Sequence, residues 1–122
     1  MAKFSFVILF VDNPPRSAEL YSSLLGCPII DNAPTFAMLP LREGVMLGLW
    51  QHDGVVPKAM ASAGGSEIAL TAENDAEVAQ MHENWKKRGL KIVQAPTKAD
   101  FGFTFTALDP DGHRLRVLAP AR

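Results

Sequence analysis

The chain has 122 residues, of which 48% are hydrophobic and 20% are charged, and its formal net charge is −1 at pH 7. This composition is typical of a globular protein and excludes disorder. The length is typical of one domain. Because there is no basic excess, nucleic acid and anionic membrane surfaces are poor partners, and we expect the chain to bind neither.

Two further features concern the cellular location. The longest strongly apolar stretch, residues 4–11, is too short to span a bilayer, and the N-terminal residues lack the charged, apolar and cleavage segments of a signal peptide. The single cysteine, Cys27, allows no internal disulfide, which agrees with a reducing compartment. We therefore expect a cytoplasmic protein.

The first half of the chain predicts a strand, a helix and three further strands. Residues 6–13 have the pattern of a strand leading into a helix, because Asn13 is a preferred cap and Pro14 suits the first helical position. The helix is expected to end at Gly26. Strands are then predicted at residues 28–31, 35–39 and 45–51. This βαβββ module covers about residues 1–51.

A linker and a second module follow. Residues 52–65 are rich in Gly, Ala and Pro and lack a sustained period, which is typical of a linker. At a shift of 61 residues the first strand aligns with residues 67–74, where Asn74 and Glu77 predict the capped start of a helix that ends at Gly89. The second module covers about residues 66–122. Its remaining strands are predicted at residues 91–94, 101–108 and 114–118, with a tight turn at residues 109–112.

The two modules, the helix-opening segment at residues 11–17, the Leu25-Gly26 helix end and the turn at residues 109–113 together resemble the vicinal oxygen chelate superfamily. This superfamily includes glyoxalase I, extradiol dioxygenases and bleomycin-binding proteins. The resemblance implies an α+β fold, with two βαβββ modules forming a curved mixed sheet around a cavity in a single domain of residues 1–122. Because a lone pair of modules leaves sheet edges open, we expect a homodimer.

Metal-dependent members of this superfamily carry one metal ligand on the first and last strand of each module. The resemblance places Phe6, Gly48, Glu67 and Arg116 at these four positions. Phe6 and Gly48 offer no side-chain donor, and the guanidinium of Arg116 is a permanent cation, so only Glu67 could bind a metal ion. We therefore expect no metal and no other cofactor, and a Glu67–Arg116 salt bridge in place of coordination.

Strand alternation predicts which side chains line the cavity. Aromatic residues and a few charges share the cavity side, which suits a flat, partly polar organic molecule. We expect Trp50 to stack on such a ligand. No catalytic residue is predicted. The predicted ligand-binding residues are Phe6, Phe36, Met38, Gly48, Trp50, Glu67, Phe101, Phe103, Phe105 and Arg116.

The Leu49-Trp50 pair and the segments 66–68, 100–105 and 109–113 look similar to a metal-free branch that binds phenazine-type antibiotics. The resemblance implies a binding protein rather than an enzyme. Its ligand would be a small planar aromatic compound, and its role antibiotic sequestration of the phenazine or bleomycin-binding kind.

Two alternatives remain open from the sequence. One is a divalent-metal lyase, isomerase or dioxygenase with non-standard ligands such as Glu67, Glu73 and a histidine. The other is a regulatory or interaction domain without a small ligand, in which Phe6, Trp50 and Phe103 would fill the cavity.

Overall fold

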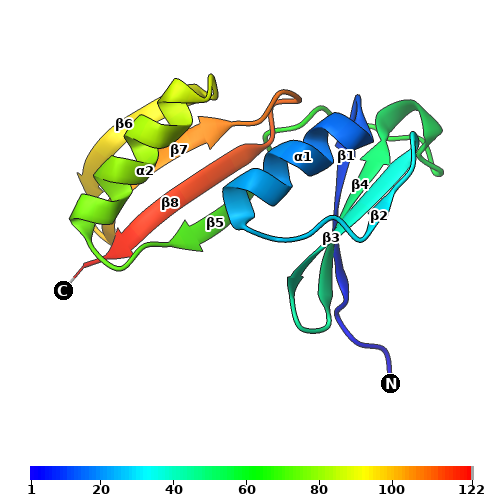
Figure 1. Ribbon diagram of the computed structural model, residues 1–122, viewed down its shortest axis with the longest axis horizontal. Coiled ribbons are helices and arrows are strands. Elements are labelled where there is room, and N and C mark those ends of the chain that lie inside the picture. Colours follow the sequence, from blue (N-terminus) through cyan, green and yellow to red (C-terminus); the bar gives the residue numbers. More distant parts are fainter. Residues whose placement is uncertain (122) are drawn as a thin grey trace. The chain divides into compact units, whose positions relative to one another are not determined.

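A computed structural model of the chain describes residues 1–121 and contains the same βαβββ order twice (Figure 1). The chain divides into two units, Met1–Ala61 and Ser62–Arg122, so the boundary falls inside the predicted linker. The predicted α+β class and the two modules are confirmed. Each module has its own four-stranded sheet. The expectation that both modules form a single domain stays a prediction.

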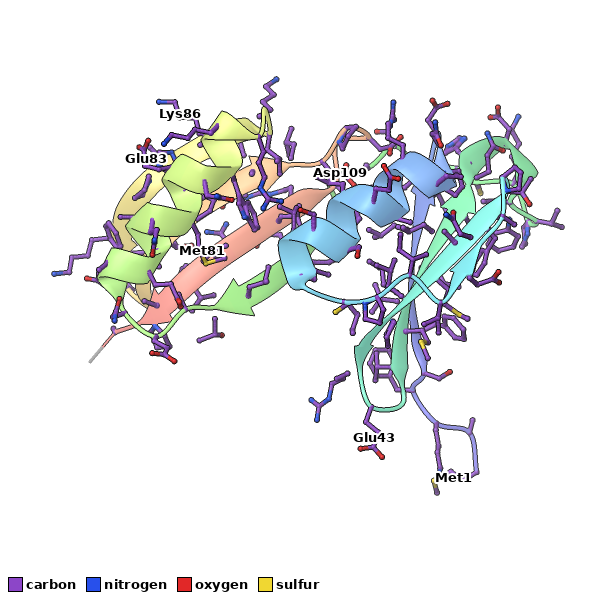
Figure 2. The ribbon with its side chains drawn as sticks, viewed as in Figure 1. Met1, Glu43, Met81, Glu83, Lys86 and Asp109 are labelled. Atoms are coloured by element: carbon purple, nitrogen blue, oxygen red, sulfur yellow. The ribbon has the colours of Figure 1, made fainter. Side chains whose placement is uncertain are left out.

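The first unit has one helix packed on a mixed sheet with strand order β1-β4-β3-β2. β1 and β4 are parallel, and the other two pairings are antiparallel. Figure 2 shows Glu43 at the tip of the β3–β4 hairpin. The elements are β1 (Phe6–Val11), α1 (Pro14–Leu25), β2 (Asp31–Asn32), β3 (Phe36–Arg42), β4 (Val45–Gln51) and the 3-10 turn η1 (His52–Gly54).

The helix α1 begins and ends where the sequence predicts. The Asn13 side chain accepts a hydrogen bond from the backbone N–H of Arg16 at 3.2 Å, and Gly26 donates its backbone N–H to the Ser22 carbonyl at 2.9 Å. Ala18 and Tyr21 on this helix are fully buried. They form the core together with the helix-facing side chains of the sheet, Leu9, Val11, Ala37, Leu39, Leu47 and Leu49.

The second unit repeats this arrangement with strand order β5-β8-β7-β6. β5 and β8 are parallel, the remaining pairs are antiparallel, and α2 contacts β6, β7 and β8 (Figure 1). Figure 2 shows Glu83 and Lys86 on the outer side of α2. The elements are β5 (Glu67–Thr71), α2 (Asp75–Lys87), β6 (Lys91–Ala99), β7 (Gly102–Leu108) and β8 (Arg114–Pro120).

The start of α2 confirms the predicted cap, with one difference. Asn74 accepts a hydrogen bond from the backbone N–H of Glu77 at 2.9 Å. The Glu77 carboxylate reaches back to the N–H of Glu73, also at 2.9 Å, one residue further than a standard capping box. Val78 and Trp85 are buried in the core of this unit, as their helical spacing predicts.

Five strands differ from their predicted bounds. β3 (Phe36–Arg42) and β8 (Arg114–Pro120) end three and two residues later than predicted, and β3 also begins one residue later. β2 is only Asp31–Asn32, later and shorter than predicted. β6 extends to Ala99 past Pro96, because β6 is an edge strand, where a residue without an N–H is tolerated. β7 begins at Gly102 rather than at residue 101. At Gly102 itself the φ is +149° and a Cβ would lie 2.0 Å from the Ala119 carbonyl oxygen, so this position requires glycine.

The predicted turn between β7 and β8 is confirmed. The Gly112 N–H donates to the Asp109 carbonyl at 3.1 Å, and the Asp109 side chain accepts hydrogen bonds from the backbone of Asp111 and His113. This closed turn fixes the register in which Arg114 enters β8. Neither helix of residues 1–121 has the length and apolar character needed to cross a membrane.

Candidate functional site

The side of the first sheet opposite α1 is apolar and rich in aromatic rings, and we call it the aromatic face. The strand register places its members next to one another, since Phe36 pairs with Trp50, and Trp50 with Phe10. The face consists of Phe6, Ile8, Phe10, Phe36, Met38, Met46, Gly48 and Trp50.

Aromatic contacts order the centre of this face. The rings of Phe10 and Trp50 meet edge to face, with centroids 6.2 Å apart and an interplanar angle of 82°. The Phe36 ring lies over Gly48, because a Cβ added at position 48 would be only 2.9 Å from Phe36 Cζ. The glycine therefore leaves the space that the tip of the Phe36 ring occupies. The second of the four predicted metal-ligand positions is thus covered by a phenyl ring.

The aromatic face is only partly covered within the chain. Phe6 is 42% exposed and Ile8 is 43% exposed, although both lie in a regular strand of a well-packed sheet. Phe36, Met38 and Trp50 are partly exposed as well. A contiguous group of exposed apolar side chains on a rigid sheet is typical of a binding surface.

The corresponding side of the second sheet, opposite α2, carries charges, and we call it the charged face. Arg116 forms two parallel hydrogen bonds to Glu67, from Nε to Oε1 at 2.7 Å and from Nη2 to Oε2 at 3.0 Å. Arg114, which pairs with Glu67 in the strand register, approaches Oε2 with Nη2 at 2.7 Å. The predicted Glu67–Arg116 salt bridge is confirmed, and a second arginine joins it.

Two neutral groups hold the remaining side of the Arg116 guanidinium. Its Nη1 donates to Gln94 Oε1 at 3.1 Å and to Thr104 Oγ1 at 3.2 Å. Thr104 in turn donates to the Val117 carbonyl at 2.8 Å, and Gln94 accepts from the Thr106 hydroxyl at 3.0 Å. The β6 bulges next to Gln94 aim its side chain at this network. Arg116 is therefore fixed in one orientation.

The network sets the protonation state of both partners. Hydrogen bonding from Arg116 lowers the pKa of Glu67 below its ordinary 4.5, more than burial raises it, and the two arginine charges lower it further. The hydrogen bond to Glu67 likewise raises the pKa of Arg116. The side chains of Glu67, Arg116 and Arg114 are 28%, 16% and 39% exposed, so solvent reaches the cluster from one side. Glu67 and Arg116 are therefore both charged at neutral pH.

Phe101, Phe103 and Phe105 were all predicted to line the cavity, but in the structure they do not lie on the same side of the second sheet. Phe105 is fully buried beneath α2, where its ring meets Trp85 at 5.3 Å and His82 at 5.4 Å between centroids. Its prediction as a cavity residue is therefore wrong. Alternation shows which residues share a face but not which face is which, and here Thr104 and Thr106 take the side of Arg116.

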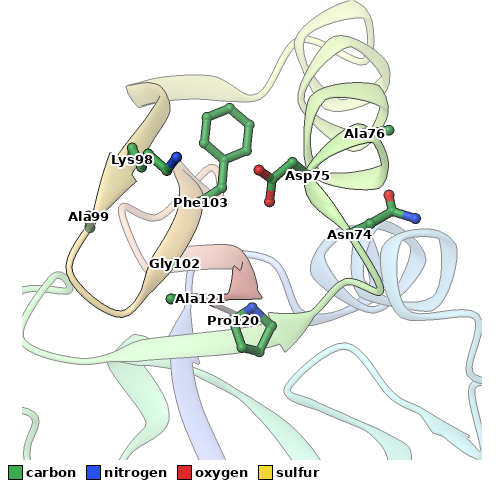
Figure 3. Close-up of a pocket in the computed structure, with 9 residues that line it drawn as sticks. All are labelled: Asn74, Asp75, Ala76, Lys98, Ala99, Gly102, Phe103, Pro120 and Ala121. Atoms are coloured by element: carbon green, nitrogen blue, oxygen red, sulfur yellow. The ribbon is translucent and has the colours of Figure 1, made fainter.

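Phe103 also lies on the helix side, contrary to the prediction. It lines a pocket of about 550 Å³ between the first turn of α2, the β6–β7 hairpin and the end of β8 (Figure 3). Figure 3 shows Phe103 and Asp75 pointing into this space, with Lys98 on the hairpin. Phe101 alone of the three is on the charged face, in the turn before β7. There the guanidinium carbon of Arg116 is 5.8 Å from the centroid of its exposed ring.

The four predicted metal-ligand positions do not fit a metal ion. Both oxygens of Glu67 are bound by guanidinium groups, and the other positions hold a phenyl ring, a glycine and an arginine. Residues 1–121 contain no group of three or more His, Cys, Asp or Glu side chains close enough to hold an ion. Glu73, proposed in the enzyme alternative, belongs to no such group.

Several residues of the two faces were missing from the predicted set, among them Phe10, Arg114 and Gln94. Phe10 has the same parity as Phe6 and Ile8 in β1, so strand alternation could have found it. Arg114 was on the correct side by alternation, but its contact with Glu67 depends on the register of β5 and β8. Gln94 reaches Arg116 only because of a bulge, for which the sequence gives no clear signal.

Comparisons with known proteins agree with this architecture. Residues 3–117 match the family model described as the Glyoxalase/Bleomycin resistance protein/Dioxygenase superfamily. The phenazine antibiotic resistance protein EhpR of Enterobacter agglomerans is 26% identical over 113 residues, covering 90% of this chain and 86% of EhpR.

Two solved structures show the same fold. The solution structure of protein ATC0852 from Agrobacterium tumefaciens is 48% identical and has a TM-score of 0.89, with 100% of both chains covered. A glyoxalase-related enzyme from Fulvimarina pelagi has a TM-score of 0.83 at 19% identity, covering 98% of this chain and 88% of the other. With its two βαβββ modules and a family match over nearly its whole length, the chain belongs to the glyoxalase/bleomycin resistance protein/dioxygenase superfamily.

Proposed function

We propose that this protein binds a small planar aromatic compound without a metal ion, and that it sequesters an antibiotic of the phenazine kind. The observation that carries the proposal is the aromatic face, an apolar sheet surface whose Phe10, Phe36 and Trp50 rings are ordered by contact yet partly open. Flat aromatic molecules bind such surfaces by stacking and by apolar burial.

The charged face supplies the polar part of the proposal. Its Glu67–Arg116 pair takes the place of coordination chemistry, because the carboxylate that could bind a metal ion is neutralised by guanidinium groups. The name of the EhpR relative supports a phenazine as the ligand class. The ligand contacts in this proposal are Phe6, Phe36, Met38, Gly48, Trp50, Glu67, Phe101 and Arg116.

The assembly and location belong to the same proposal. Both sheets end in edge strands, β1 and β2 in the first unit and β5 and β6 in the second. We propose that two copies associate as a homodimer, which would cover some of these edges. We also propose that the protein acts in the cytoplasm as a single domain.

Isothermal titration calorimetry with phenazine derivatives tests the binding proposal. The protein is first dialysed against a chelator, so that any metal requirement would show as lost binding. We expect saturable binding to the chelated protein, weakened about tenfold or more by Trp50→Ala, because stacking on an indole contributes about 1 kcal/mol beyond apolar burial. Phe101→Ala is a second variant, which tests the aromatic ring of the charged face separately.

Two outcomes would contradict the proposal. One is the absence of binding and of thermal stabilisation across phenazines of different charge. The other is a stoichiometric divalent metal that survives dialysis and is lost in Glu67→Ala, since this would favour the enzyme alternative.

A further inference from the structure

We propose that the charged face selects ligands with an anionic substituent, and that the ligand class is a planar aromatic carboxylate with Arg114 as its anion-binding residue. This inference rests on the proposed function and adds to it the charge of the ligand and the residue that recognises it.

The first step is the charge of the face. Glu67 is the only acidic residue in the four strands β5 to β8, whereas Lys91, Arg114 and Arg116 are basic and share its side of the sheet. Two guanidinium groups therefore contact a single carboxylate, and the other members of the network, Gln94 and the threonines, are neutral. The cluster carries one uncompensated positive charge.

The second step identifies which arginine is available. Arg116 uses three of its nitrogens on Glu67, Gln94 and Thr104, so its donors are largely occupied. Arg114 contacts Glu67 through Nη2, and its Nε is buried, so the donors that a ligand can reach are on the two Nη groups. At 39% exposure, the Arg114 side chain is the more accessible of the two.

The third step concerns the chemistry that fits. A guanidinium offers five N–H donors in a planar fork that matches the two oxygens of a carboxylate. A ligand carboxylate would satisfy the idle donors of Arg114 and neutralise the excess charge. The exposed Phe101 ring beside Arg116 adds a flat apolar surface to the same face. An aromatic acid therefore matches the charged face better than a neutral aromatic compound.

A matched pair of ligands tests this inference. Phenazine-1-carboxylate and phenazine-1-carboxamide have nearly the same shape, and at neutral pH they differ by one negative charge. Their dissociation constants are measured by titration calorimetry with the chelated full-length protein. We expect the carboxylate to bind about tenfold more tightly than the amide, a difference of about 1.4 kcal/mol.

Variants assign the preference to Arg114. In Arg114→Gln the ratio of the two dissociation constants should fall close to one, because the guanidinium group that would bind the carboxylate is removed. Lys87→Gln removes the same positive charge from the exposed last turn of α2, and it should leave the ratio unchanged. Arg114→Lys retains the positive charge and is the alternative variant to measure if Arg114→Gln does not fold. It should keep a preference for the carboxylate.

The ratio separates failure of this inference from failure of the proposed function. If wild-type protein binds both compounds equally, the charge selection is wrong and the binding function stands. If Arg114→Gln keeps the full preference, Arg114 is not the anion-binding residue. If neither compound binds, the proposed function is wrong and the inference falls with it.

Discussion

The two modules of this chain have the same element order and sheet topology, yet their open sheet faces differ in chemistry. Seven apolar side chains and one glycine make up the aromatic face of the first module. The charged face of the second has a carboxylate, two guanidinium groups, an amide and hydroxyl groups at comparable positions. The helix-facing sides are alike, because both are closely packed apolar cores. Residues that fold the module are thus distinct from residues that define its open face.

The largest loss of stability is expected from a mutation in the apolar core, the part in which the two modules are alike. Phe105→Ala should lower the free energy of unfolding by about 3–5 kcal/mol, because it removes a fully buried ring in contact with Trp85. Phe101→Ala, four residues earlier and exposed, should cost less than about 1 kcal/mol. Chemical denaturation measures both. Equal effects would mean that the two rings do not lie on opposite sides of the sheet.

The second prediction concerns the unequal roles of the two arginines. Arg116→Met should lower the free energy of unfolding by about 2 kcal/mol, since it removes one hydrogen bond each from Gln94 and Thr104 and both hydrogen bonds from Arg116 to Glu67. Arg114→Gln removes a more exposed contact and should cost about 0–1 kcal/mol. If denaturation shows the larger loss for Arg114, the network does not centre on Arg116.

The third prediction uses acid to remove the carboxylate. The pKa of Glu67 is lower in the folded protein than its ordinary 4.5, mainly through its hydrogen bond with Arg116. Its contribution to stability, about 1 kcal/mol for a pair partly open to solvent, is therefore complete above pH 4.5. This contribution is lost as the pH falls through the folded-state pKa.

A comparison of wild type with Glu67→Gln isolates the contribution of the ionised Glu67 carboxylate to stability. The wild type should be the more stable protein at neutral pH, and the difference should shrink as the pH falls below 4.5. Urea denaturation at several pH values measures it. A difference that is constant with pH would show that the charge of Glu67 does not stabilise the charged face.

The smallest effect is expected from Gly48→Ala on the aromatic face. The new Cβ would lie 2.9 Å from Phe36 Cζ, and the ring is the mobile end of a partly exposed side chain, so it can move aside. Gly48 is buried, but the stability should change by less than about 1 kcal/mol, because the clash is with the movable end of the Phe36 side chain. Binding of a phenazine should nevertheless weaken, since the Phe36 ring would be displaced from its place over Gly48. Denaturation and calorimetry together test this, and unchanged affinity would remove Gly48 and Phe36 from the proposed site.

Most of the fold follows from local sequence signals. Asn13 with Pro14, Gly26 and Asn74 define the helix ends, and the turn at residues 109–112 fixes the last hairpin. Alternation also assigned Trp50, Glu67 and Arg116 to the helix-free sides of their sheets. These features depend on nearby residues and on a period of two, which the sequence displays directly.

The errors concern features that depend on distant residues. The orientation of β7, and with it Phe103 and Phe105, depends on which side of the sheet α2 covers, which alternation within one strand does not reveal. The Gln94 contact depends on a bulge in an edge strand, and the Arg114 contact on strand register. The extent of β6 past Pro96 depends on its place at the sheet edge.

Native mass spectrometry of the freshly purified protein mixed with phenazine-1-carboxylate tests the central claim most directly, because one spectrum reports subunits, metal and ligand. The account predicts a homodimer that carries the aromatic acid and no divalent metal. In a parallel sample, Trp50→Ala should keep the subunit number and lose the ligand. A chain with one tightly held metal ion and no bound phenazine would contradict the claim that this protein binds an aromatic ligand in place of a metal ion.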